Sequence, residues 1–172
     1  EAHSSLAHAA RVMDVDVVKV PVGADGRMTG AEIDAALGGD WSGVFAVVAT
    51  GGTTNFGIVD NIASVVAEAK KHDVWVHVDG AYGLAGMVAS STKSYFAGLG
   101  EVDSFIVDPH KWLYAPYDAC ALIYRFEGGH TFRQATTALL AQLTAQQTAV
   151  ELAVSRLSVM ECRVKPLRDG DT

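Results

Sequence analysis

Basic residues are in the minority in this chain, which has 13 Lys and Arg but 20 Asp and Glu among its 172 residues. The net charge of −7 disfavours nucleic acid and an anionic membrane surface as partners, because both attract basic proteins. Long apolar runs are also absent, and none reaches the roughly 18 residues that a membrane-spanning helix needs. We therefore expect neither a nucleic-acid partner nor a membrane partner.

Cysteines are few, and the two present, Cys120 and Cys162, lack the C-x-x-C spacing of a redox or zinc motif. We interpret them as free thiols of a cytoplasmic protein. The sequence opens with Glu1-Ala2-His3, without a basic or apolar leader and without an initiator Met. We therefore expect a cytoplasmic location and a chain that starts inside a longer protein.

The rest of the composition, with 49% hydrophobic residues and 17 glycines, is typical of a folded α/β protein. Thr29 with Glu32 three positions later is a capping box, and Lys70-Lys71-His72 suits the end of a helix. Short Val-rich runs alternate with these helical segments. The predicted helices cover about 4–13 (capped by Ser4 or Ser5), 29–37 and 60–72, and the predicted strands cover 14–22, 44–49, 74–78, 104–107 and 119–124.

This alternation predicts an α/β fold with a mostly parallel sheet flanked by helices. The unbroken apolar run at 44–49 predicts a strand buried on both faces. Thr54, Asp79 and Lys111 each follow a predicted strand. Because ligands bind outside the carboxyl ends of parallel strands, we expect these three residues to share a site. From residue 126 the sequence is rich in Ala, Gln, Thr and Leu, which predicts a helical tail over 126–172, separate from a domain over 1–125.

Lys111 and Asp79 have the most informative chemistry. Lys111 precedes Trp112, and apolar surroundings would desolvate its amine and favour the nucleophilic form. Asp79 precedes Gly80 and Ala81, residues small enough to let a flat ring approach, and a buried carboxylate needs a cationic partner. Alone, they would be read as a surface lysine and a loop acid. Together they are the two groups that pyridoxal phosphate chemistry requires, an amine for the aldehyde and an acid for the pyridine nitrogen.

A metal site is the less favoured interpretation. His77 and Asp79 have H-x-D spacing, and His72, Asp108 and His110 are further candidate ligands. The pattern supplies no obvious third ligand and no His-x-x-x-His helix, so we expect no metal. His77 can instead be a core histidine that is satisfied by hydrogen bonds.

Four segments within residues 1–125 resemble the group II pyridoxal-phosphate-dependent amino-acid decarboxylases, relatives of aromatic-L-amino-acid, glutamate and tyrosine decarboxylases. The four segments are Ala2-His3-Ser4-Ser5, Gly52-Thr53-Thr54, His77-Val78-Asp79-Gly80-Ala81-Tyr82 and Asp108-Pro109-His110-Lys111-Trp112. The segment that begins at His77 resembles the family's His-Val-Asp-Ala-Ala-Tyr strand end. In the segment that begins at Asp108, many relatives have Asn at the position of Asp108.

The resemblance implies a role for each matching residue. Lys111 would form the Schiff base with the cofactor, and Asp79 would pair with the pyridine nitrogen. His3 would stack on the cofactor ring and approach the substrate carboxylate. The other cofactor-binding residues implied are Thr54, Ala81, Asp108 and His110, the last two beside the phosphate.

The resemblance also implies a fold and an activity. The fold would be the large domain of the fold-type-I pyridoxal phosphate enzymes, and the reaction would convert an L-amino acid to an amine and CO2 in a homodimer. In relatives a phosphate loop precedes the histidine segment and a small domain follows, so we expect a fragment that is inactive alone. Two alternatives stay open: a cysteine desulfurase or aminotransferase on the same fold, and a catalytically silent dimerising remnant.

Overall fold

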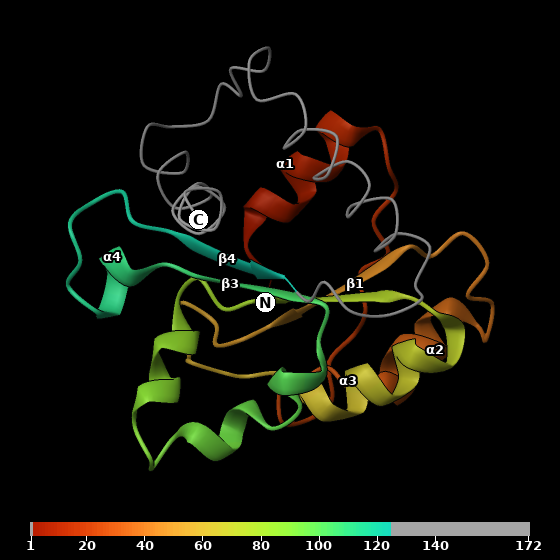
Figure 1. Ribbon diagram of the computed structural model, residues 1–172. Helices are drawn as coiled ribbons and strands as arrows, with labels where there is room; N and C mark the ends of the chain where they lie inside the picture. Colours follow the sequence, from red (N-terminus) through yellow and green to blue (C-terminus); the bar gives the residue numbers. More distant parts are fainter. Residues whose placement is uncertain (1, 125–172) are drawn as a thin grey trace, which may run out of the picture.

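The computed structural model describes residues 2–124, and the predicted helical tail at 126–172 lies outside these residues. Within the described part, four strands form one sheet in the order β1-β2-β3-β4 (Figure 1). The first three are parallel and the last is antiparallel to its neighbour, which confirms the mostly parallel sheet. The strands are β1 (Ala46–Thr50), β2 (Trp75–Asp79), β3 (Ser104–Val107) and β4 (Ala121–Tyr124).

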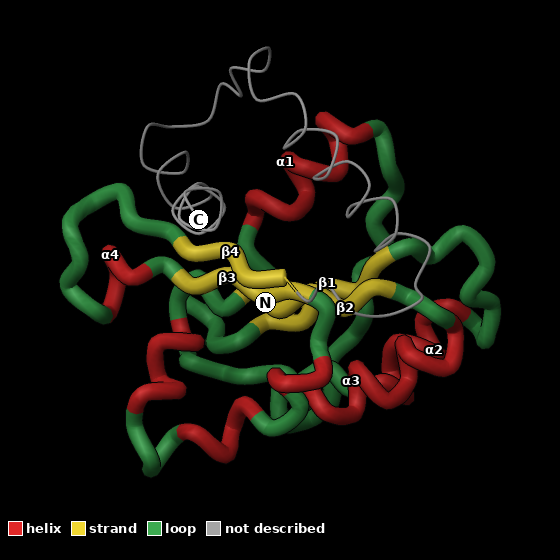
Figure 2. Tube along the Cα trace, in the orientation of Figure 1, coloured by secondary structure: helices red, strands yellow, loops and turns green. Residues whose placement is uncertain are grey.

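Helices flank both faces of the sheet. Figure 1 shows α2 (Gly30–Leu37) and α3 (Ile62–Ala69) on one face and α1 (Ser4–Met13) on the opposite face. The short helices between β2 and β3 lie on the same side as α3 (Figure 2). In the described part of the chain, no helix has the length and apolar character needed to cross a membrane. The remaining helices are η1 (Lys70–His72), η2 (Gly83–Val88), η3 (Lys93–Phe96), η4 (Leu99–Glu101) and α4 (Pro109–Trp112).

The core lies between the sheet and the α2–α3 layer. The apolar face of α3, formed by Ile62, Val65, Val66 and Ala69, packs on this side of the sheet. Burying each large aliphatic side chain stabilises the fold by about 1.5–3 kcal/mol. Strand β1 was predicted to be buried on both faces, and this is wrong. Its residues alternate between buried and half-buried, because the α2–α3 layer covers only one of its faces.

Two buried carboxylates tie loops to the sheet. Asp60, 8% exposed, accepts hydrogen bonds from Met28 N at 2.8 Å and from Thr50 N at 2.7 Å. Asp103, 6% exposed, accepts one from Val76 N at 2.8 Å. A backbone N–H that is buried without an acceptor costs stability, so these carboxylates stabilise the ends of β1 and β2.

The strand predicted over 14–22 does not form, since the sheet of the described residues contains only β1 to β4. Val17, Val18 and Val22 are 52%, 56% and 49% exposed, and only Val20 of this segment packs against the core. Alternating valines favour a strand only where a neighbouring strand offers hydrogen bonds and one face can be buried. Neither condition is met at this segment.

Side-chain caps determine where the helices begin. The Thr29 and Glu32 capping box is present at α2, as predicted, and Asn61 caps α3. The prediction that Ser4 or Ser5 caps α1 is wrong, because His3 is the N-cap and its Nδ1 accepts from Ser5 N at 3.3 Å. An imidazole nitrogen with a free lone pair can replace a hydroxyl oxygen as the acceptor in this position.

We expect Asp60→Ala to lower the free energy of unfolding by about 3 kcal/mol, because two buried N–H groups lose a charged acceptor. Asp60→Asn, which keeps one acceptor oxygen, should lose about half as much. Urea unfolding followed by circular dichroism measures both changes. Asp16→Ala, at an exposed position, is the matched control and should change stability by no more than about 0.5 kcal/mol. An Asp60→Ala loss as small as the control's would contradict the bracing role of Asp60.

Candidate active site

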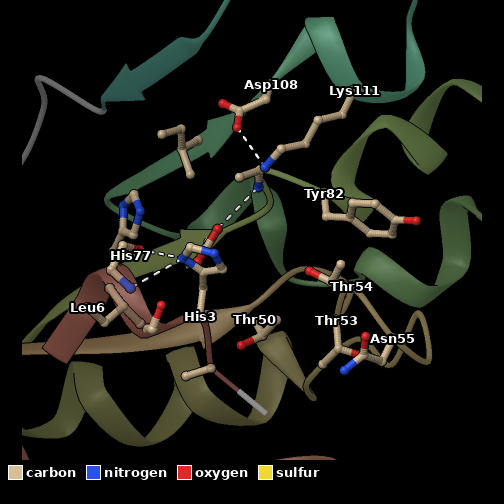
Figure 3. Close-up of a pocket in the computed structure, with 17 residues that line it drawn as sticks. His3, Leu6, Thr50, Thr53, Thr54, Asn55, His77, Tyr82, Asp108 and Lys111 are labelled. Atoms are coloured by element: carbon tan, nitrogen blue, oxygen red, sulfur yellow. Dashed lines mark hydrogen bonds and ion pairs between the residues drawn. The ribbon is translucent and has the colours of Figure 1, made fainter. Parts of the chain in front are cut away.

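A cavity of about 660 Å³ opens at the carboxyl ends of β1, β2 and β3 (Figure 3). Its walls come from the start of α1, the turns after β1 and β2, and the segment that leads from β3 into α4. This is the sheet edge at which the sequence predicts a shared site. The lining residues with polar or ionisable side chains include His3, Thr50, Thr53, Thr54, His77, Asp79, Tyr82, Asp108 and Lys111.

The hydrogen-bond register of the sheet aligns one residue from each parallel strand along the cavity. Thr50 pairs with Asp79, and Asp79 pairs with Ile106, so the three residues form one row across three parallel strands. All three line the cavity. Asp79 therefore stands in the middle of the row, with a strand on each side.

The turn after β2 orients the Asp79 carboxylate. Ala81 N donates to Asp79 Oδ1 at 3.2 Å, and Gly80 N donates to Ile106 O at 3.1 Å. A Cβ on Gly80 would lie 2.4 Å from the Cβ of Leu84, so this turn requires glycine. Among the described residues, no hydrogen-bond donor contacts Asp79 Oδ2. The half-buried carboxylate thus keeps one acceptor oxygen for a ligand.

Lys111 lies in the short helix α4, and its Nζ contacts Asp108 Oδ2 at 2.8 Å (Figure 3). The Lys111 side chain is 36% exposed and the Asp108 side chain 13%. The apolar surroundings expected for Lys111 are therefore wrong, because an anion from the preceding turn pairs with its amine. This pairing directs the amine toward the cavity.

A contact between two glycines brings the turn after β1 against the turn after β2. A Cβ on Gly52 would lie 2.7 Å from Gly83 Cα, and a Cβ on Gly83 would lie 2.6 Å from Gly52 Cα. Gly52 also has a φ of 111°, which L side chains rarely adopt. This close backbone approach places Thr53 and Tyr82 on adjoining walls of the cavity.

His77 lies on the same strand as Asp79, two residues earlier, and also lines the cavity. Its Nδ1 lies 2.8 Å from Ser104 Oγ, and the same Oγ accepts from Trp75 Nε1 at 2.9 Å. Burial of the ring lowers the pKa of His77 below its usual 6.5, and the negative charge of Asp79 opposes this shift. The prediction of a hydrogen-bonded histidine is thus confirmed, but the ring faces the cavity rather than the core.

Six of the seven predicted site residues line this one cavity, and His110 does not. His110 Nδ1 donates to Ala119 O at 2.6 Å, and its ring contacts Tyr117 edge-on. In this arrangement His110 supports the loop after α4. The six that meet are His3, Thr54, Asp79, Ala81, Asp108 and Lys111.

The sequence prediction missed several lining residues, among them Thr50, Thr53 and Ile106. Thr50 and Ile106 lie at strand ends, and only the register that pairs both with Asp79 identifies them. Thr53 could have been predicted from the sequence, because it belongs to the Gly-Thr-Thr turn. It is 5% exposed and its Oγ1 accepts from Ile58 N at 3.1 Å, so it holds the turn in shape.

Comparison with known proteins identifies the family of this chain. A family model of the pyridoxal-dependent decarboxylase conserved domain matches residues 1–159. The chain belongs to this family. The match extends past residue 125, and a domain boundary at that position stays a prediction.

Two relatives illustrate the similarity within the pyridoxal-dependent decarboxylase family. The chain is 33% identical over 125 residues to an aromatic-L-amino-acid decarboxylase of Drosophila lebanonensis, and 35% identical over 130 residues to an L-2,4-diaminobutyrate decarboxylase of Rhizobium meliloti. These alignments cover 71% and 72% of this chain but 31% and 26% of the relatives. The chain therefore spans about a third or less of the length of these decarboxylases.

Solved structures agree with the predicted fold. The crystal structure of TDC from Oryza sativa with PLP and tryptamine matches with a TM-score of 0.66 and 32% identity, over 72% of this chain and 28% of that one. The predictions of membership in the group II decarboxylase family and of the α/β fold of these enzymes are confirmed.

One group of possible metal ligands lies apart from the decarboxylase-like site. Among the described residues, Asp34, Glu68 and His72 have ligand atoms within 4.8 Å of one another, and none of the three lines the cavity. Asp34 accepts from Trp41 Nε1 at 2.8 Å, and Glu68 pairs with Lys71 Nζ at 2.7 Å. Because these carboxylates already have protein partners, we assign no metal to them.

We expect stability to fall as the pH is lowered through 6.5, because unfolded His77 takes up a proton there while folded His77 does not. The loss ends below the lowered pKa and is at most about 1.4 kcal/mol per pH unit for one proton. Urea unfolding between about pH 7.5 and 5 measures it, and His77→Gln should have a flatter profile in this window. His8→Gln, on an exposed face of α1, is the control. Parallel profiles for His77→Gln and the wild type would contradict this assignment.

Proposed function

We propose that this chain forms the cofactor-binding part of a pyridoxal-phosphate-dependent enzyme that decarboxylates an L-amino acid to an amine and CO2. The observation that carries the proposal is the meeting of Lys111, Asp79 and His3 around one cavity. Membership of the pyridoxal-dependent decarboxylase family supports the reaction type. The relatives whose names state this activity are much longer than this chain, so the activity is proposed for the protein that contains it.

The residues present fit the cofactor. A cavity of about 660 Å³ lies within the range of roughly 300–1,000 Å³ typical of cofactor sites. Asp79 keeps one carboxylate oxygen without a hydrogen-bond donor among the described residues, which suits the protonated nitrogen of a pyridine ring. Lys111 supplies the amine that an aldehyde needs, on the opposite wall of the same cavity.

Pyridoxal phosphate, when bound, supplies an aldehyde that takes up amines and a ring that withdraws electrons from the bond to be broken. Lys111 Nζ would hold the cofactor through its aldehyde. Asp79 holds the proton on the ring nitrogen, and its half-buried position strengthens that pairing. His3 supplies a flat ring at the start of α1, and Thr54 and Ala81 supply small side chains to the same cavity.

Asp108 has a positioning role in this proposal. Its carboxylate, 13% exposed, contacts Lys111 Nζ at 2.8 Å and so orients the amine before the cofactor arrives. A role for His110 beside the phosphate has less support, because its Nδ1 donates to Ala119 O and its side chain does not line the cavity. Its imidazole would act through the loop that follows α4.

The proposed substrate is an L-amino acid. The named relatives act on aromatic amino acids and on L-2,4-diaminobutyrate, which share the α-amino and α-carboxylate groups but differ in the side chain. The proposal therefore extends to the shared groups and leaves the substrate side chain open.

A homodimer and a cytoplasmic location are part of the proposal. Large apolar side chains near α4 stay exposed, including Trp112 at 47% and Tyr117 at 85%, and a second copy of the chain would cover such residues. The cytoplasmic location follows from the sequence, in which Cys120 and Cys162 lack the C-x-x-C spacing of a redox or zinc motif. Sedimentation analysis of the purified protein tests the dimer.

We expect incubation with pyridoxal phosphate and reduction with borohydride to fix the cofactor on Lys111, since its amine lines the cavity. Peptide mass spectrometry locates the label. Lys111→Ala should lose the specific label, while Lys93→Ala, an exposed lysine outside the cavity, should keep it. Labelling of the Lys111 peptide no stronger than that of exposed lysines would rule out the assigned site.

We expect Asp79→Asn to lower CO2 release about 100-fold in the protein that contains this chain, because it removes the charge that holds the ring proton. The fold should be retained, since Oδ1 can still accept from Ala81 N. Chromatography of the products separates the candidate reactions: an amine with CO2 supports the decarboxylase, and a keto acid would instead indicate an aminotransferase.

A further inference from the structure

Ser104 joins Trp75 to His77 behind the cavity. Ser104 is 4% exposed and stands opposite His77 in the register of β2 and β3. Its Oγ lies 2.9 Å from Trp75 Nε1 and 2.8 Å from His77 Nδ1. These are the only hydrogen-bond partners of its side chain in the described part of the chain.

The direction of both hydrogen bonds follows from donor chemistry. An indole N–H can only donate, so Ser104 Oγ accepts from Trp75. The buried Ser104 hydroxyl proton then needs an acceptor, and His77 Nδ1 is the one in reach. Nδ1 must therefore keep its lone pair, which leaves the proton of the neutral imidazole on Nε2.

Nε2 is the other polar atom of the ring, and among residues 2–124 no hydrogen-bond partner contacts it. His77 lines the cavity beside Asp79, two residues along the same strand. The other ionisable side chains that line the cavity are His3, Tyr82, Asp108 and Lys111, and the last two pair with each other. The ring thus has an unused donor next to the carboxylate that the ligand must reach.

We propose that Trp75 and Ser104 hold His77 as the neutral Nε2–H tautomer, so that its ring offers an uncharged hydrogen-bond donor to a ligand bound beside Asp79. The ligand is pyridoxal phosphate or the substrate joined to it, so this part rests on the proposed function. Trp75 and Ser104 act as positioning residues, and His77 is a ligand-binding residue. A neutral ring also leaves Asp79 as the anion that meets the cationic ring nitrogen, because an imidazolium two residues away would compete for that carboxylate.

Nitrogen NMR of the histidine rings in the full chain tests the tautomer without any cofactor. In the wild type, the His77 Nδ1 signal should be that of an unprotonated nitrogen that accepts a hydrogen bond. Ser104→Ala should move it toward the position of a free acceptor, Ser104→Thr should restore it, and exposed His8 is the internal reference. A protonated Nδ1 in the wild type would overturn the inference, as would a signal that Ser104→Ala leaves in place. Trp75→Phe provides a second variant, in which the ordering of the Ser104 hydroxyl should weaken.

Binding of pyridoxal phosphate tests the donor. His77→Phe removes Nε2–H and should weaken binding about tenfold, the value of one hydrogen bond, whereas His77→Gln keeps an N–H donor and should bind like the wild type. Equal binding by the phenylalanine variant would overturn the donor role. Failure of the wild type to bind pyridoxal phosphate at all contradicts the proposed function instead, and the NMR signal then decides the tautomer by itself.

Discussion

Parallel pairing of β1, β2 and β3 is the constraint on which the site depends. The register places Thr50, Asp79 and Ile106 in one row, at the ends of β1 and β2 and one residue before the end of β3. Residues that follow each strand therefore leave the sheet at the same edge and surround a common space. A shift of one residue in β2 would turn Asp79 to the opposite face, because side chains alternate along a strand. The chemistry of the cavity is thus tied to the hydrogen-bond register of the sheet.

The register is itself held by buried polar groups and by close backbone contacts. Asp60 and Asp103 accept hydrogen bonds from backbone N–H groups at Thr50 and Val76, which lie in β1 and β2. The contact between Gly52 and Gly83 brings the turns after these strands together. Asp60, Asp103 and Gly83 do not line the cavity themselves. They keep the ligand-contacting side chains in place without using any of their polar atoms.

The charges around the cavity are arranged in a way that matches pyridoxal phosphate chemistry. Lys111 and Asp108 form one ion pair on the α4 wall, and Asp79 keeps a carboxylate oxygen for a ligand on the β2 wall. His77 lies in β2 and lines the cavity. Burial lowers the pKa of its ring and so favours the neutral form. An amine and an anion on separate walls are what a ring with an aldehyde and a basic nitrogen needs.

Local sequence determined the features of this protein that depend on neighbouring residues alone. The α2 capping box, the apolar face of α3, the strand at 104–107 and the segments around His3, Asp79 and Lys111 could all be predicted, since each is a short-range pattern. Tertiary structure decided the rest. The valines of 14–22 found no partner strand, and the register of β1, β2 and β3 brought Thr50 and Ile106 beside Asp79. These outcomes depend on which groups lie close in space, and hydrogen bonding and burial between distant segments settle that only when the chain has folded.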